Sequence, residues 1–223
     1  MVLRARETAS YRDPVTITSA LLGFAAVAAV LTVIPGLDTT LVLRSALTQS
    51  RRHAVVTALG VSTGALAWGA AAAVGAAALL AASEVAYRAV TIVGAAYMAY
   101  LGVMLIVRSF RHDPVVVDGP AVAVPLWRSF CSGAWTNLLN PKIGAFYVAT
   151  IPQFIPDGAS HLGMGLLLAG VHDVIGLLWF AGVIWGAQAA RRWLANARAL
   201  KVIDRIAGVV LVGFGARLVL ERH

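Results

Sequence analysis

Two prolines interrupt apolar segments that lie 106 positions apart in the chain. Pro35 stands in the sequence Pro-Gly-Leu-Asp, and Pro141 stands in the sequence Asn-Pro-Lys. A proline removes a backbone donor and clashes with the carbonyl group one turn earlier, so each should kink or break a helix. Irregular backbone at membrane depth is tolerated only where it is buried in protein or lines a wet cavity. Matched breaks in the two halves of a chain are therefore the best sequence indication of a transporter's central site.

The composition is that of an integral membrane protein. Hydrophobic residues occupy 60% of the 223 positions, charged residues occupy only 13%, and the mean hydropathy is +0.81. A soluble domain of this size needs more charge than this to cover its surface. The formal net charge of +8 would suggest nucleic acid as the partner of a soluble protein. In this chain it indicates arginines that face anionic lipid, so the bilayer is the expected partner and nucleic acid is not.

Six apolar segments are candidates for membrane spans, since a crossing needs about 20 mainly apolar residues. They are residues 15–35, 54–82, 89–107, 129–155, 158–190 and 202–220. The last segment is the weakest, because Asp204, Arg205 and Arg217 lie within it. The pattern predicts an all-α, multi-pass membrane protein.

A polar stretch divides this pattern into two halves. Residues 108–128 contain HDP and DGP turns and form a central polar loop between residues 15–107 and residues 129–220. Residues 1–14 form a polar N-terminal extension. Three helices in each half force the halves into opposite orientations, as in many secondary transporters. We therefore expect two inverted three-helix repeats, each with a proline-broken first helix.

An acidic residue lies beside the first break. Asp38 follows Pro35 and Gly36 directly. An acid at the centre of a bilayer costs about 2.5–3.5 kcal/mol on insertion scales, so an acid that is kept there is a candidate for substrate binding or coupling. Its alternative role is to cap the half-helix that begins at Thr39, because aspartate is a good N-cap residue.

Polar residues also surround the second break. Lys142 can meet a substrate carboxylate, pair with Asp38 or Asp173 inside the bundle, or extend its ammonium group to the membrane interface. Asn137 and Asn140 are one helical turn apart, so they share a face and can bond the carbonyl groups that the break frees. Both Lys142 and Asn140 are therefore candidate site residues.

A histidine and an aspartate are neighbours inside the fifth apolar segment. His172 titrates near neutral pH in its unperturbed state, and the adjacent Asp173 would complete a proton-handling pair. Neighbouring residues on a helix point about 100° apart, so both cannot face one cavity squarely. Asp173 is the preferred candidate, and His172 is the second.

Other kinds of site lack the residues that they need. The five histidines are scattered without a His-x-x-x-His pair, and the chain has one cysteine, so no metal site is expected. A glycine-rich phosphate loop is missing from the sequence, and no serine or cysteine stands in a recognisable catalytic motif. We therefore expect neither an enzyme nor a bound cofactor.

Both break motifs resemble those of the LysE/RhtB family of amino-acid exporters. Residues 35–38 (PGLD) look like its PGP-(D/N) motif, although Leu37 replaces the usual second proline. Residues 140–142 (NPK) and 151–154 (IPQF) are similar to its NPK motif and the PQF that follows. The resemblance covers residues 15–220. It implies a transporter of the inner membrane that exports an amino acid or an amino-acid derivative, coupled to the proton gradient.

The physical argument places the substrate at the breaks. Half-helix N-termini present free N–H groups to a carboxylate, and Asp38 or Asp173 would hold the ammonium group. An inorganic-ion exporter is an alternative, but it would need clustered carboxylates, histidines or thiols. A non-transporting membrane scaffold is another. The glycine spacings at residues 60–64 and 182–186 would suit a scaffold or a homodimer, but the buried charges would then be unexplained.

Overall fold

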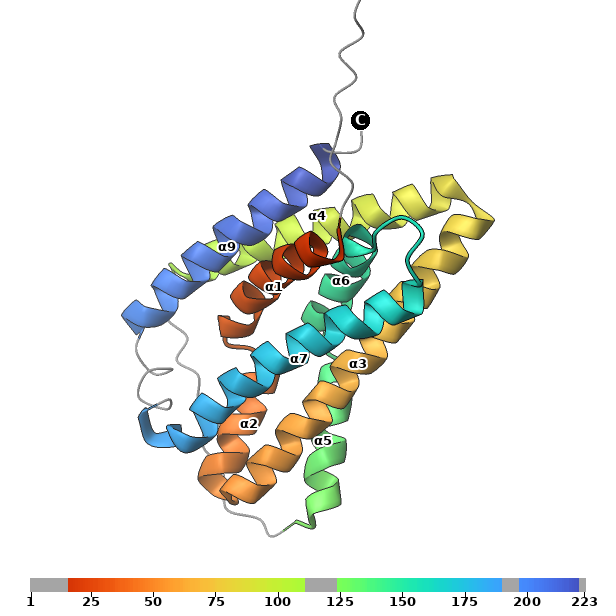
Figure 1. Cartoon of the computed structure of the whole chain (residues 1–223). Helices are drawn as coiled ribbons and strands as arrows, with labels where there is room; N and C mark the ends of the chain where they lie inside the picture. The colour runs from red at the N-terminus through yellow and green to blue at the C-terminus, as the bar shows by residue number, and fades with distance from the viewer. Residues whose placement is uncertain (1–15, 111–123, 190–196, 221–223) are drawn as a thin grey trace, which may run out of the picture.

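The computed structural model describes residues 16–110, 124–189 and 197–220, and within these ranges the regular structure is helical throughout (Figure 1). The expectation of an all-α protein is confirmed for this part of the chain. The predicted N-terminal extension and most of the predicted central loop lie outside the described residues.

The helices follow one another with short connections. In chain order they are α1 (Ile17–Val33), α2 (Leu37–Thr48), α3 (Arg51–Ala82), α4 (Glu84–Arg108), α5 (Leu126–Leu138), α6 (Pro141–Thr150), the short 3₁₀ helix η1 (Ile151–Phe154), α7 (His161–Trp185) and α9 (Ala197–Leu220).

Hydroxyl side chains fix the start of four of these helices. Each accepts a hydrogen bond from the backbone N–H three residues later, which satisfies one of the free donors of the first turn. These residues are Thr16 at α1, Ser50 at α3, Ser83 at α4 and Ser160 at α7. Because Ser83 caps α4, this helix begins five residues before the predicted span. The charged side chains of Glu84 and Arg88, which the prediction excluded, pair with each other on its surface.

Both predicted helix breaks are present. Between α1 and α2 the chain bends by 55° at residues 34–36. In the second half α5 ends at Leu138, and Pro141 is the first residue of α6. The backbone N–H of the first residue of a helix has no intrahelical partner, so a proline there costs no hydrogen bond, and its fixed backbone angle suits a helix start. Pro35, in contrast, lies in the linker itself.

Three of the described helices are long and apolar enough to cross a membrane. They are α3, α4 and α7, and the bent pair α1–α2 is a fourth if it counts as one span. The structure therefore supports a multi-pass protein with three or four clear spans in its described part. The arrangement of six spans in two repeats stays a prediction at this point.

Glycines bring α3 and α5 into backbone contact. A Cβ atom added at Gly60 would lie 2.1 Å from the carbonyl oxygen of Phe130, and one at Gly133 would lie 2.1 Å from that of Thr57. The first predicted glycine spacing is thus used inside the chain, whereas Gly182 of the second has open space around it. This close approach carries the end of α5 to the centre of the bundle.

The remaining helices surround this centre. Helices α1 and α2 pack against α7, α6 packs against α3 and α4, and α9 lies along α4 (Figure 1). A core of apolar side chains, with Phe24, Phe146 and Tyr147 the largest of the fully buried ones, fills the space beside α1 and α6. The packing brings the two breaks together, although about 100 residues separate them in sequence.

Candidate binding site at the two helix breaks

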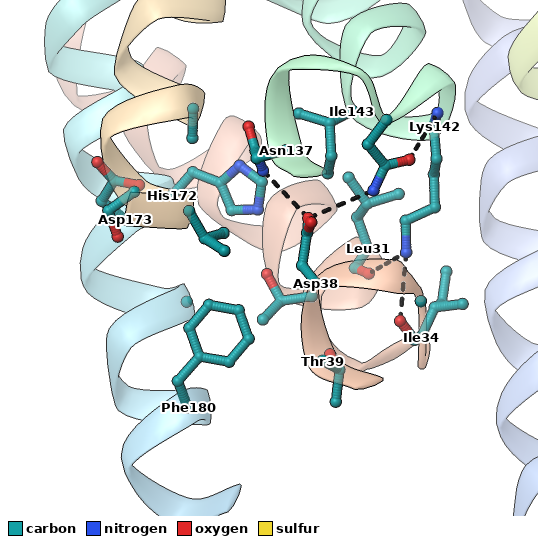
Figure 2. A pocket seen from close by; sticks show the side chains of 17 residues that line it. Leu31, Ile34, Asp38, Thr39, Asn137, Lys142, Ile143, His172, Asp173 and Phe180 are labelled. Carbon is teal, nitrogen blue, oxygen red and sulfur yellow. Dashed lines mark hydrogen bonds between the residues drawn. The ribbon is translucent and has the colours of Figure 1, made fainter. Parts of the chain in front are cut away.

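A small cavity of about 50 Å³ lies where the two breaks meet (Figure 2). Residues of α1, α2, α3, α5, α6 and α7 line it. Its polar and charged residues are Thr32, Asp38, Thr39, Ser62, Asn137, Asn140, Lys142, His172 and Asp173. All five residues predicted for binding or coupling therefore line one cavity, together with Gly36 of the first break, whereas Pro35 and Pro141 do not line it.

Asp38 is bound from the second break. It is the second residue of α2, and it is only 8% exposed. Its Oδ2 atom accepts a hydrogen bond from Nδ2 of Asn137 at 3.1 Å and from Nδ2 of Asn140 at 3.3 Å. The N-cap of α2 is Gly36, without a side-chain bond. The alternative prediction that Asp38 serves as a helix cap is therefore wrong.

Two oxygen atoms at this junction are buried without a hydrogen bond. They are Oδ1 of Asp38 and Oδ1 of Asn137, and neither has a partner among the described residues. A buried acceptor that is left unpaired costs roughly 1–3 kcal/mol. Since both residues line the cavity, a donor that enters the cavity can recover this cost.

Lys142 replaces the backbone donor that Pro35 lacks. In a continuous helix the N–H of residue 35 would bond the carbonyl oxygen of Leu31. Here the Nζ atom of Lys142 donates to the oxygen of Leu31 at 3.3 Å and to that of Ile34 at 3.2 Å. The Nζ atom of Lys142 thus binds the end of α1, and no ion pair joins it to either acid of the cavity.

Asn140 joins the two breaks from the other side. It caps α6, because its Oδ1 atom accepts a hydrogen bond from the backbone N–H of Lys142 at 3.1 Å. Its Nδ2 atom donates to Asp38. The prediction that Asn137 and Asn140 bond freed carbonyl groups is wrong, since their Nδ2 groups bond the carboxylate instead. The first break is thus held by residues of the second.

His172 and Asp173 both reach the cavity, at its side formed by α7 (Figure 2). The ring of His172 is buried, its Nδ1 atom lies 2.9 Å from the hydroxyl of Tyr147, and the ring packs against Phe146. Asp173 is half-buried and interacts with the hydroxyl of Ser62 on α3. The structure therefore anchors His172 firmly, whereas Asp173 lies at the contact of α7 with α3.

The sequence did not single out Ser62 and Tyr147. Ser62 lies between Gly60 and Gly64 of α3, a spacing that predicts a contact between helices. Tyr147 is an aromatic residue five positions after Lys142 in an apolar run. Both residues carry a hydroxyl group within an otherwise apolar span, and this is the sequence feature that could have identified them. The part of the chain that the structure describes contains no group of three metal-binding side chains.

Comparison with known proteins identifies the family. Residues 29–222 match the LysE type translocator family. The chain is 32% identical to the uncharacterized membrane protein YrhP of Bacillus subtilis, over 88% of this chain and 97% of that protein. It is 27% identical to the threonine efflux protein of Escherichia coli K12 (84% and 91%) and 27% identical to the leucine efflux protein of Salmonella choleraesuis (83% and 87%). No solved structure matches the chain significantly. The chain, a multi-pass membrane protein, therefore belongs to the LysE type translocator family.

Proposed function

We propose that this protein is a secondary transporter of the inner membrane that exports an amino acid or an amino-acid derivative and couples export to protons. Relatives named as threonine and leucine efflux proteins support the substrate class and the direction. The observation that supports it most directly is the pair of unpaired acceptors, Oδ1 of Asp38 and Oδ1 of Asn137, at the cavity between the breaks.

These acceptors suit an ammonium group. An ammonium group carries three N–H donors and a positive charge. The carboxylate of Asp38 supplies the opposite charge, and the amide of Asn137 supplies a second oxygen. The carboxylate of the same substrate would find Lys142 and the N-terminal turn of α2, where the helix dipole favours negative charge. A zwitterion matches this distribution of charge better than a simple amine or a simple acid does.

The size of the cavity requires a conformational change during transport. Small-molecule sites commonly have volumes of about 300–1,000 Å³. The cavity at the breaks, at about 50 Å³, has room for a few water molecules and not for an amino acid. Alternating access supplies the required change, because one repeat rocks against the other around a fixed site.

We also propose the six-span arrangement of two inverted repeats. It pairs α1–α2 with α5–α6, α3 with α7, and α4 with α9. The contacts are exchanged as a two-fold axis requires: α1 and α2 contact α7, α5 and α6 contact α3, and the paired helices contact each other. The exchange is incomplete, since α6 also packs on α4 without a comparable contact between α2 and α9. An experimental structure with parallel repeats would contradict this arrangement.

The two alternative functions have less support. A non-transporting scaffold would leave the buried Asp38 and its two amide donors without a purpose, and the glycines at residues 60 and 64 already pack against α5. An inorganic-ion exporter would need a cluster of ligands, and the described residues offer no group of three.

Export is tested with purified protein in lipid vesicles. Vesicles loaded with L-threonine or L-leucine should take up the labelled amino acid by counterflow, and protein-free vesicles should not. An imposed pH gradient should accelerate net movement of the same amino acid. If neither amino acid nor any other L-amino acid of a standard panel is exchanged, the proposed function is wrong.

Asp173→Asn is expected to slow gradient-driven transport at least about tenfold while counterflow changes little. Coupling needs a group that binds and releases a proton, and a half-buried carboxylate at a contact between two helices can do this when the contact opens. The measurement compares both rates in the same vesicles, and Asp157→Asn, at an exposed loop position, is the control. Equal losses in the two assays would place Asp173 in substrate binding or folding instead.

A further inference from the structure

The first break leaves two carbonyl oxygens of α1 without their usual donors. In an uninterrupted helix the N–H of residue 35 would bond Leu31, and the N–H of residue 38 would bond Ile34. Residue 35 is a proline without an N–H, and the bend of 55° ends α1 at Val33. The Nζ atom of Lys142 binds both oxygens, at 3.3 and 3.2 Å. Lys142, from the second half of the chain, thus supplies the hydrogen-bond donors that the end of α1 lacks.

The surroundings of Lys142 are built for this contact. A Cβ atom at Gly36 would lie 3.3 Å from Nζ, so the glycine leaves room for the ammonium group. Asn140 bonds the backbone N–H of Lys142 and, through its amide, the carboxylate of Asp38. The second break therefore holds both sides of the first one, the end of α1 and the start of α2 (Figure 2).

We propose that Lys142 is a positioning residue whose hydrogen bonds to Leu31 and Ile34 hold the first break in its present bend. We call this contact the latch, and we propose that the substrate carboxylate releases it. This inference rests on the proposed transport of amino acids. Lys142 lines the cavity, so a carboxylate bound there can reach its ammonium group. Its present acceptors are neutral carbonyl groups. A carboxylate adds the attraction of a full negative charge, which the two neutral carbonyl groups lack, so it competes for the ammonium group.

Transport therefore requires both the ammonium group and the carboxylate of the substrate. The ammonium group of a ligand is held by Asp38 whether or not the ligand has a carboxylate. Only a ligand with a carboxylate removes Lys142 from Leu31 and Ile34. Without these two hydrogen bonds the angle between α1 and α2 can change. An amino alcohol, which lacks the carboxylate, can enter the cavity only when alternating access has widened it. It then leaves Lys142 on Leu31 and Ile34, so it does not release the junction and is not transported efficiently.

The test uses L-leucine and L-threonine against L-leucinol and L-threoninol. Thr39, buried on α2 at the cavity, is changed to cysteine as a reporter of opening, in a Cys131→Ser background. In this otherwise unmodified chain the two amino acids should increase labelling of the reporter by a small thiol reagent. The amino alcohols should compete for binding without increasing it. Transport should favour the amino acid over its alcohol by about tenfold or more.

Lys142→Met keeps most of the length of the side chain and removes its donors. With this variant the reporter should be labelled without any ligand, and the transport ratio of amino acid to amino alcohol should fall towards one. Lys201→Met removes the other lysine of the chain, on α9, and should behave like the unmodified protein. Lys142→Arg retains the charge and the donors, and should retain the response to the carboxylate.

Each outcome has one meaning. If Lys142→Met shows the same labelling and the same ratio as the unmodified chain, the latch is overturned. If Lys142→Met does not fold, Lys142→Arg decides: loss of the carboxylate response in that variant overturns the latch, and retention supports it. If the unmodified chain transports no amino acid, the proposed function fails and the latch fails with it. If the unmodified chain transports amino acids but Lys142→Met leaves the ratio of amino acid to amino alcohol unchanged, only the latch is overturned and the proposed function stands.

Discussion

Asp38→Asn should reduce export by about 30- to 1,000-fold while the protein still reaches the membrane. The substitution preserves the shape of the side chain, and its remaining oxygen can accept the hydrogen bonds from Asn137 and Asn140. It removes the negative charge that the proposed ammonium group requires. Hydrogen bonds to charged groups contribute about 1.5–3 kcal/mol each, and a buried charge left without its partner costs more, which corresponds to this loss of rate.

The control for this experiment is Asp157→Asn. Asp157 is exposed in the connection before α7 and is not among the residues that line the cavity, so its substitution should leave export unchanged. Counterflow of L-threonine and L-leucine in vesicles measures both variants at equal protein content. If Asp38→Asn exports at the normal rate, the negative charge of Asp38 is needed neither for substrate binding nor for proton coupling. The carboxylate then serves only as the hydrogen-bond acceptor for Asn137 and Asn140.

The sequence was sufficient to find the position of the site. Proline and aspartate in an apolar run are each unfavourable, and their coincidence at residues 35–38 requires a local environment that compensates both. The same reasoning located the second break at Pro141. For this reason the residues chosen beside the breaks meet at one cavity in the structure. Their roles in binding and coupling stay predictions.

The partners of these residues were not predictable in the same way. Whether Lys142 faces the lipid surface or the end of α1 depends on how the halves pack, and one sequence does not contain that information. The alternative role of Asp38 as an N-cap was wrong for a related reason. The half-helix starts at Leu37, two residues earlier than expected, so the acid lies inside the first turn and its side chain is free to cross to α5.

The helix boundaries differ from the predicted spans where charge was used to end a span. The predicted span begins at residue 89, after Glu84 and Arg88, yet α4 begins at Glu84 because Ser83 caps it there. Hydropathy alone measures transfer to lipid and is insensitive to caps and to surface ion pairs. Within the segment 129–155, the break predicted at Pro141 separates α5 from α6, and the side chain of Asn140 caps α6.

Close packing of α3 on α5 is what places Asn137 at the cavity. Asn137 lies at the end of α5, and a Cβ atom added at Gly64 of α3 would be 2.9 Å from it. The glycines of α3 therefore have a functional consequence beyond helix association. If the two helices were separated by the width of a methyl group, the amide of Asn137 would move away from Asp38, which it now contacts at 3.1 Å.

Gly60→Ala is accordingly expected to destabilise the protein and to impair export together. The added methyl group would lie 2.1 Å from the carbonyl oxygen of Phe130, which is backbone and cannot rotate away. Overpacking of this kind costs about 1–3 kcal/mol, which corresponds to a fall in Tm of roughly 2–12 °C for a chain of this size. Thermal unfolding in detergent and counterflow in vesicles measure the two effects.

Gly75→Ala is the matched control, because Gly75 lies in the same helix and a Cβ atom there would meet nothing within 4 Å. Alanine is the better helix former by about 0.5–1 kcal/mol, so this variant should be as stable as the unmodified protein or slightly more stable. Its export should be unchanged. If Gly60→Ala instead matches Gly75→Ala in both measurements, α3 and α5 do not meet backbone to backbone, and the contact of Asn137 with Asp38 loses its structural basis.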